Sequence, residues 1–163
     1  IVGFDKAIKS LNFRMKYKKI LILVAGGVVP SIIFVLKKMN VSEITISNRT
    51  KQKAENLKIL FKNLNVLEWG NLTDFDVIIN ATSLGLNNEI INLDFSSVGK
   101  NKLFYDVIYN PTETKFLKKS KELGNLTENG RTMFLFQAAE AFKLWHNIEP
   151  EINRSIFKIL DND

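Results

Sequence analysis

The sequence predicts an α/β protein with a doubly wound parallel sheet and helices on both faces. Runs of buried-strand character alternate with helix-like segments over most of the chain, as in sheets of this kind. The first such run, residues 20–24, leads through a Gly-Gly pair into an amphipathic helix, and the next ends in Asn-Arg-Thr. A strand–turn–helix–strand unit of this kind can hold a dinucleotide.

The individual elements follow from the spacing of apolar residues. Val29, Ile33 and Leu36 share one helical face, and Pro30 falls in the first turn, where a missing N–H costs little. Helices are expected at 3–17, 28–39, 51–62, 114–123, 131–146 and 150–161. Strands are expected at 20–24, 41–47, 64–68, 75–80, 103–109 and 125–128. The stretch between them at 84–101 is polar and irregular.

Composition narrows the class of protein. The chain has 163 residues, which suits one domain, and its 45% hydrophobic and 25% charged residues are typical of a globular protein. It has no cysteine and one histidine, His146, so neither disulfides nor a metal site is expected. No apolar run is long enough for a bilayer and no signal-peptide pattern begins the chain, so we expect no membrane contact and a cytoplasmic location.

The charge of the chain raises the alternative of nucleic-acid binding. Its formal net charge is +6, but the lysines are scattered over helical stretches without a dense tract. Net charge alone indicates non-specific attraction rather than a site. We therefore expect no nucleic-acid partner, and a solvated basic surface instead.

The glycine turn is the first candidate site. A pyrophosphate needs bare backbone amides and a helix N-terminus directed at it, and Gly26 and Gly27 permit that approach because they lack a Cβ. The alternative is a tight turn without a ligand. Val24 stands where the usual fingerprint has glycine, and a β-branched residue there is disfavoured at positive φ.

The end of the second predicted strand is the second candidate. Arg49 can bind phosphate oxygens with its guanidinium, Thr50 can cap the next helix, and Lys53 adds a charge on the same face. A base at this position, where NAD binders usually keep an acid, indicates a 2′-phosphate and hence NADP. The alternative is an ordinary capped surface helix.

Two further segments follow predicted strands, and a third lies on a helix. Asn80-Ala81-Thr82-Ser83 and residues 106–111 fall at carboxyl ends of strands, where small polar groups can bind ribose and substrate hydroxyls. Turn formation alone would also explain them. Met133 and Gln137 share one helix face, and Gln137 could bind a polyol or simply lie at the surface.

These motifs, taken in order, resemble the C-terminal NADP-binding domain of the shikimate dehydrogenase family over essentially the whole chain. The matching segments are Ala25-Gly26-Gly27, Asn48-Arg49-Thr50-Lys51-Gln52-Lys53, Asn80-Ala81-Thr82-Ser83-Leu84-Gly85-Leu86, residues 106–111, and Met133 with residues 137–145. The resemblance implies a Rossmann-type domain. It also implies NADPH-dependent, reversible reduction of 3-dehydroshikimate to shikimate, a step of aromatic amino-acid biosynthesis.

The resemblance assigns roles position by position. It implies pyrophosphate contacts at Ala25, Gly26, Gly27 and Val28, and contacts with the adenosine 2′-phosphate at Asn48, Arg49, Thr50 and Lys53. It implies that Val107, Gly130 and Met133 border the nicotinamide, that Asn80, Ala81 and Thr82 bind cofactor, and that Tyr109 and Gln137 touch substrate. Val24 and Thr132 depart from the family, which has glycine at both positions.

No catalytic acid or base is expected within the chain. The family's catalytic lysine belongs to an N-terminal substrate domain, and its partner aspartate would fall just before Ile1. Residues 1–17 would then form a linking helix and 131–161 helices that pack towards the missing domain. The chain alone would be inactive, and an apolar patch around Phe4, Ile8, Phe134 or Trp145 would promote self-association.

Two neighbouring functions stay open at this point. One is a quinate/shikimate-type dehydrogenase, because most of the residues that select substrate would lie in the absent domain. The other is a nucleotide-binding module that performs no catalysis. The effect of Val24 on affinity, the oligomeric state, and whether the other domain was removed or is naturally absent are also open.

Overall fold

The computed structural model describes residues 1–24 and 26–161, apart from the side chains of residues 154, 160 and 161. In these residues six parallel strands form one sheet in the order β3-β2-β1-β4-β5-β6. The strands are β1 (Lys19–Val24), β2 (Glu43–Asn48), β3 (Asn65–Glu68), β4 (Val77–Ala81), β5 (Leu103–Asp106) and β6 (Leu126–Glu128). This is the strand order of a Rossmann fold, and it confirms the predicted fold class.

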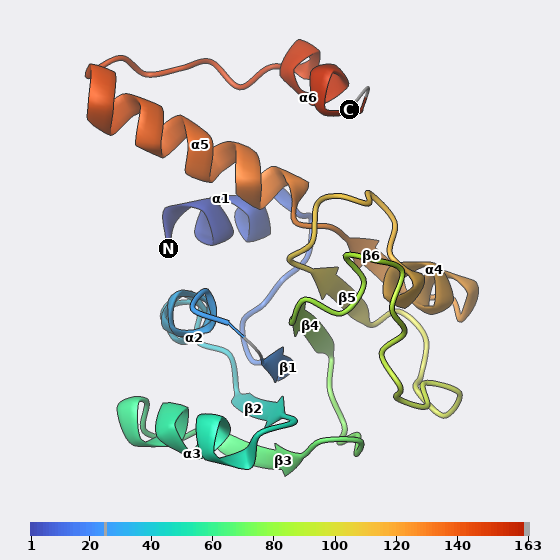
Figure 1. The fold of residues 1–163 in the computed structure, drawn as a ribbon. Helices are drawn as coiled ribbons and strands as arrows, with labels where there is room; N and C mark the ends of the chain where they lie inside the picture. Colours follow the sequence, from blue (N-terminus) through green and yellow to red (C-terminus); the bar gives the residue numbers. More distant parts are fainter. Residues whose placement is uncertain (25, 162–163) are drawn as a thin grey trace.

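Helices cover the two faces of the sheet unequally (Figure 1). The first face carries α1 (Val2–Ser10), α2 (Val29–Lys38), α3 (Lys51–Leu60) and α5 (Arg131–His146). The second face carries α4 (Lys115–Glu122) and the irregular segment 82–102. The last helix, α6 (Arg154–Asp161), lies beyond α5 and away from the sheet.

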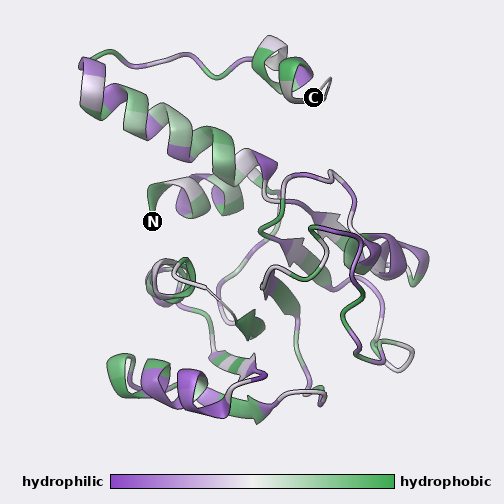
Figure 2. Ribbon diagram, in the orientation of Figure 1, coloured by the Kyte–Doolittle hydropathy of each residue, from purple (hydrophilic) through white to green (hydrophobic). Residues whose placement is uncertain are grey.

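The core of the described residues falls into two clusters, one on each face of the sheet. In the first, Phe4 meets the ring of Tyr105 edge-on, with ring centroids 5.4 Å apart. In the second, Phe104 contacts other phenylalanine rings, among them Phe95 at 5.4 Å between centroids. Each fully buried ring contributes about 1.5–3 kcal/mol through loss of water contact. Figure 2 shows the central strands as hydrophobic and most of α3 and α4 as hydrophilic, which agrees with this burial.

Several elements are shorter than predicted because local hydrogen bonds end them. The helix predicted at 3–17 ends at Ser10, whose hydroxyl donates to the Ala7 carbonyl at 2.7 Å. The strand predicted at 103–109 ends at Asp106, whose carboxylate accepts from the Ile108 amide and turns the chain. The helix predicted at 150–161 begins at Arg154, and Asn153 accepts from the Ser155 amide there.

The two helices α1 and α5 pack closely against each other. A Cβ built on Gly3 would lie 2.3 Å from Gln137 Cγ and 2.7 Å from the Met133 carbonyl oxygen, so only glycine fits there. Phe4 and Ile8 of α1 lie in the first core cluster and are 0% and 2% exposed. The prediction that they form an exposed apolar patch is therefore wrong, because both side chains lie in the first core cluster, where Phe4 packs against Tyr105 of β5.

The outer ends of α5 and α6 do expose apolar side chains. Trp145 is 79% exposed and Leu144 is 82% exposed, as are, to lesser degrees, Phe142, Ile148 and Ile159. Phe134 lies at the other end of α5 and is only partly exposed. Within the described residues, no helix has the length and hydrophobicity to cross a membrane.

Candidate functional site

An open cleft of about 600 Å³ lies at the carboxyl ends of β1, β4 and β5. Its lining residues come from the glycine turn, from the segment after β4 and from the segment after β5. They are Gly26, Gly27, Val28, Ala81, Thr82, Ser83, Leu86, Val107, Ile108, Tyr109 and Asn110. The sheet therefore brings three of the predicted segments together, because the carboxyl ends of parallel strands share one edge.

The glycine wall of the cleft is open to a ligand. A Cβ built on Gly26 or Gly27 would meet no atom within 4 Å, and neither glycine has a positive φ. Neither internal packing nor a special backbone conformation therefore requires glycine, and the missing side chains leave free space at the cleft. Val28 is the N-cap of α2 and makes no side-chain cap bond, so no capping side chain stands between the start of this helix and a ligand.

Val24 causes no strain in this turn. It is the last residue of β1, pairs with Ala81 of β4 and does not have a positive φ. The unfavourable conformation expected for a β-branched residue here therefore does not arise. Ala25, predicted beside the pyrophosphate, lies outside the described residues.

The end of β2 carries polar groups that the protein leaves without partners. Asn48 Oδ1 accepts from the Thr50 amide at 2.8 Å, but Asn48 Nδ2 and Ser47 Oγ are buried and make no hydrogen bond among the described residues. Thr50 is the N-cap of α3 as predicted, yet its side chain makes no cap bond. The side chains of Arg49 and Lys53 are exposed. Orphaned donors beside two cations fit a ligand that brings anionic oxygens.

A buried network lies beneath the cleft and is centred on Asn80, which is 0% exposed. Asn80 Nδ2 donates to Asp106 Oδ1 at 3.0 Å and to the Leu84 carbonyl at 3.1 Å. Asn80 Oδ1 accepts from the Thr82 hydroxyl at 2.7 Å and from the Thr82 amide at 3.1 Å. Asn80 therefore shapes the cleft from below and does not line it.

Asp106 completes this network from β5. Its Oδ1 also accepts from the Ile108 amide at 3.1 Å, and its Oδ2 accepts from the Thr114 hydroxyl at 2.7 Å. Burial raises the pKa of the Asp106 carboxyl, and the hydrogen bonds from Thr114, Ile108 and Asn80 act against that rise. The sequence singled out the segment that starts at Asp106 as a turn or ligand-binding region but carried no sign of this carboxylate's burial.

The N-terminus of α5 is fitted against the end of β5. A Cβ on Gly130 would lie 1.9 Å from the Val107 carbonyl oxygen, and the Gly130 amide donates to the Ile108 carbonyl at 2.9 Å. Met133 is 5% exposed and belongs to the first core cluster. Gly130 and Met133 thus lie behind Val107, outside the lining of the cleft.

Tyr109 lies at the rim of the cleft and is held by an aromatic contact. Its ring stacks on Phe134, with centroids 4.4 Å apart and planes inclined by 18°. Gln137 follows Phe134 by three residues on α5 and is exposed, but it does not line the cleft. Of the two residues predicted to touch substrate, Tyr109 therefore lines the cleft and Gln137 lies outside it.

The irregular segment after β4 is organised by Glu89. Its Oε2 accepts from the backbone amides of Gly85 at 3.0 Å and Asn87 at 2.9 Å. Hydrogen bonding from the backbone amides of Asn87, Glu89 and Gly85 lowers the pKa of the Glu89 carboxyl to about 2. The turn that these hydrogen bonds stabilise carries Leu86, which lines the cleft.

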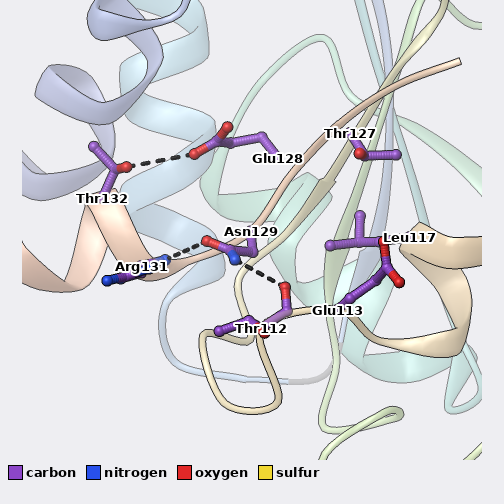
Figure 3. Close-up of a pocket in the computed structure, with 8 residues that line it drawn as sticks. All are labelled: Thr112, Glu113, Leu117, Thr127, Glu128, Asn129, Arg131 and Thr132. Carbon is purple, nitrogen blue, oxygen red and sulfur yellow. Dashed lines mark hydrogen bonds between the residues drawn. The ribbon is translucent and has the colours of Figure 1, made fainter. Parts of the chain in front are cut away.

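A smaller cavity of about 260 Å³ lies beside β6 and the start of α5 (Figure 3). Asn129 Nδ2 donates to the Thr112 carbonyl at 2.8 Å, and Asn129 Oδ1 accepts from the Arg131 amide at 3.1 Å. Burial raises the pKa of the Glu128 carboxyl, and a hydrogen bond from Thr132 opposes that rise. Asn129 thereby ties the segment after β5 to the start of α5.

Four cleft residues were not among the predicted site residues: Ser83, Leu86, Ile108 and Asn110. All four fall within the segments at 80–86 and 106–111 that the sequence had singled out, so their position was the available signal. Ile108 is 4% exposed and reads as a core residue of a strand. The structure shows no cluster of three potential metal ligands in the part of the chain it describes.

Comparison with known proteins gives a consistent family. The family model described as shikimate / quinate 5-dehydrogenase matches residues 5–108. The chain is 49% identical over 162 residues to a shikimate dehydrogenase (NADP(+)) of Pelagibacter ubique, covering 99% of this chain and 61% of that protein. The chain therefore spans about three fifths of the length of that curated relative.

Solved structures show the same similarity. A shikimate dehydrogenase from Aquifex aeolicus superposes with a TM-score of 0.83 at 36% identity, covering 99% of this chain and 60% of the other. Another, from Thermus thermophilus in complex with NADP(H) and shikimate, gives a TM-score of 0.80 at 29% identity, covering 91% of this chain and 56% of the other.

Proposed function

The chain belongs to the shikimate / quinate 5-dehydrogenase family, and on that premise we propose that it is the NADP-binding part of a shikimate dehydrogenase. The proposed enzyme reduces 3-dehydroshikimate reversibly to shikimate with NADPH in aromatic amino-acid biosynthesis. The observation that carries the proposal is an open cleft walled by Gly26 and Gly27 beside the end of β2. That end of β2 carries two cationic side chains and buried polar groups that make no hydrogen bond among the described residues. Its proposed location is the cytoplasm.

The preference for NADP is proposed to come from the end of β2. The guanidinium of Arg49 suits a phosphate dianion because it donates two parallel hydrogen bonds. The free hydroxyl of Thr50 and the ammonium of Lys53 add a donor and a charge nearby. Asn48 Nδ2, buried without a partner, supports a further contact to the same ligand.

The remaining site residues are proposed to position the coenzyme and the substrate. Gly26, Gly27 and Val28 bind the pyrophosphate at the start of α2, and Ala81 and Thr82 contact the ribose. Val107 borders the nicotinamide, and Gly130 and Met133 support it from behind. The coenzyme supplies the hydride when bound. Tyr109, oriented by Phe134, and Gln137 contact the substrate.

Proton transfer is proposed to need groups from outside this chain. None of the described residues that line the cleft is a lysine, aspartate, glutamate or histidine. Transfer of a proton to the substrate oxygen requires such a group within hydrogen-bond reach. The chain alone is therefore expected to bind coenzyme without turnover, and its partner is proposed to be an N-terminal substrate domain.

The exposed apolar ends of α5 and α6 support docking of such a domain. Leu144, Trp145 and Ile159 are each more than half exposed. Apolar patches of this kind mark interaction surfaces, and without a partner they favour self-association. We propose that this surface meets the substrate domain, or a second copy when that domain is absent.

Coenzyme titration tests the proposed function. We expect the chain to bind NADPH more tightly than NADH in calorimetry, and Arg49→Ala to weaken NADPH binding by about tenfold or more, because a charge-assisted hydrogen bond contributes about 1.5–3 kcal/mol. NADH binding should change little. Arg14→Ala, which removes the same exposed charge from the segment before β1, is the matched control. Equal affinities for NADPH and NADH would contradict the role of Arg49.

A quinate-type substrate is the second candidate, because the matching family model covers both substrates. Adding the substrate domain in trans and measuring NADP reduction with each polyol distinguishes the two. Coenzyme binding without any turnover in that mixture would favour a nucleotide-binding module.

A further inference from the structure

The buried carboxylate of Asp106 is a charge that the proposed function does not use. We infer that Asp106 makes the cleft select the oxidised, cationic form of the nicotinamide coenzyme over the reduced form. This inference rests on the proposed function, because it concerns the coenzyme assigned to the same cleft. It assigns Asp106 a positioning and selecting role at a distance, without contact to the coenzyme.

The hydrogen bonds of Asp106 indicate the ionised form. Its two oxygens accept from Asn80 Nδ2 at 3.0 Å, the Ile108 amide at 3.1 Å and the Thr114 hydroxyl at 2.7 Å. An ionised carboxylate is an acceptor only, so three donors match its charged state. All three donors are neutral groups. The ion pairs formed among the described residues do not include Asp106.

The negative charge is therefore buried without a compensating cation. Asp106 is 0% exposed. In the low dielectric of a protein interior its field reaches further than that of an exposed carboxylate. The N-terminus of α4 begins beside it, because Thr114, which donates to Asp106 Oδ2, is the N-cap of that helix, and a helix end supplies only about half a positive unit charge. The charge of Asp106 is therefore only partly offset at the end of β5, three strands away from the cationic Arg49 and Lys53 that follow β2.

This charge lies directly behind the cleft. Asp106 ends β5, and the next residues, Val107 and Ile108, line the cleft. Its register partner on β4 is Asn80, and the next residues there, Ala81 and Thr82, also line the cleft. One layer of backbone therefore separates the carboxylate from the proposed nicotinamide end.

The two forms of the coenzyme offer a clean probe of such a charge. They have nearly the same shape and differ by one positive charge on the nicotinamide ring. Two opposite unit charges about 10 Å apart attract each other, and at an effective dielectric constant near 20 that attraction lowers a dissociation constant roughly tenfold. By linkage, tighter binding of the oxidised form makes the bound pair more strongly reducing.

The test compares dissociation constants for NADP⁺ and NADPH in the wild-type chain and in Asp106→Asn. Asparagine keeps an acceptor for Asn80 and Ile108, and its amide can donate to Thr114, so the network geometry is retained. The matched control is Asp76→Asn, which also removes one carboxylate. Asp76 precedes β4 at the opposite edge, four residues or about 13 Å along the strand from Asn80.

We expect Asp106→Asn to raise the ratio of the NADP⁺ constant to the NADPH constant by about three- to tenfold, and Asp76→Asn to leave that ratio unchanged. Equal weakening of both forms in Asp106→Asn, or an unchanged ratio, would overturn the inference and leave the coenzyme site standing. Failure of the wild-type chain to bind either form would overturn both. If Asp106→Asn does not fold, Asp106→Ser removes the same charge and is measured in the same way, with the same expected ratio.

Discussion

Replacing Gly130 by alanine tests how the start of α5 is held against the sheet. The added methyl would lie 1.9 Å from the Val107 carbonyl oxygen and 2.5 Å from its carbonyl carbon. These atoms must separate by about 1.1 Å to reach 3.0 Å, below which such contacts are essentially absent from proteins. The added methyl is attached directly to the backbone of α5, and the atoms it meets are backbone atoms of Val107. The clash is therefore relieved only if α5 moves away from β5.

The expected cost follows from that movement. Overpacking of this kind costs about 1–3 kcal/mol, and loss of the hydrogen bond from Gly130 to Ile108 adds about 1 kcal/mol. We therefore expect the free energy of unfolding of Gly130→Ala to fall by about 2–4 kcal/mol. Urea denaturation followed by tryptophan fluorescence measures it, and the midpoint should fall by about 1–2 M.

The matched control is Gly99→Ala, whose Cβ would meet only Lys102 Cε, at an ordinary 3.6 Å. Its unfolding free energy should stay within about 0.5 kcal/mol of the wild-type value. A wild-type midpoint for Gly130→Ala would refute the close fit between α5 and β5.

Three further outcomes are expected. Gly27→Ala should leave the unfolding free energy within about 0.5 kcal/mol of the wild-type value, because the added methyl enters only the open cleft. In calorimetry the same change should weaken coenzyme binding roughly tenfold, and unchanged binding would count against the pyrophosphate site. Glu89 should titrate near pH 2 by NMR, and since its pKa is lowered from the ordinary 4.5, its stabilising contribution is complete above pH 4.5 and disappears as the pH falls towards 2. Glu89→Gln should remove that pH dependence, and a normal titration would contradict the turn geometry. Trp145→Glu should reduce self-association in sedimentation of the isolated chain, and a strictly monomeric wild type at high concentration would argue against that surface.

The sequence predicted those parts of the fold that local periodicity determines. Buried-strand runs such as residues 20–24 and the helical face of Val29, Ile33 and Leu36 are local patterns, and each appears in the structure as expected. The convergence of the glycine turn with the segments after β4 and β5 also followed, because parallel strands share a carboxyl edge.

Contacts between distant residues were beyond reach of such patterns. Nothing local to Gly130 indicates that the Val107 carbonyl oxygen lies 1.9 Å from where a methyl would be, and nothing near Phe4 indicates that its ring packs against Tyr105. Likewise the sequence predicted a cofactor-binding or turn role for Asn80 and a ligand-binding or turn segment at 106–111. It did not predict the hydrogen bond between Asn80 and Asp106, because that bond joins residues 26 positions apart. Helix ends were missed where a side chain bonds to the backbone of the last turn, as the Ser10 hydroxyl does by donating to the Ala7 carbonyl.

The hydrogen bonds of Asn80 have a mechanical consequence. They tie the end of β4, and the segment that follows it, to the end of β5, and so couple two borders of the cleft to each other. Gly26 and Gly27, on the opposite border, have no side chains that could make such hydrogen bonds. We therefore expect any change in the width of the cleft on binding of the proposed coenzyme to occur mainly on the Gly26–Gly27 side.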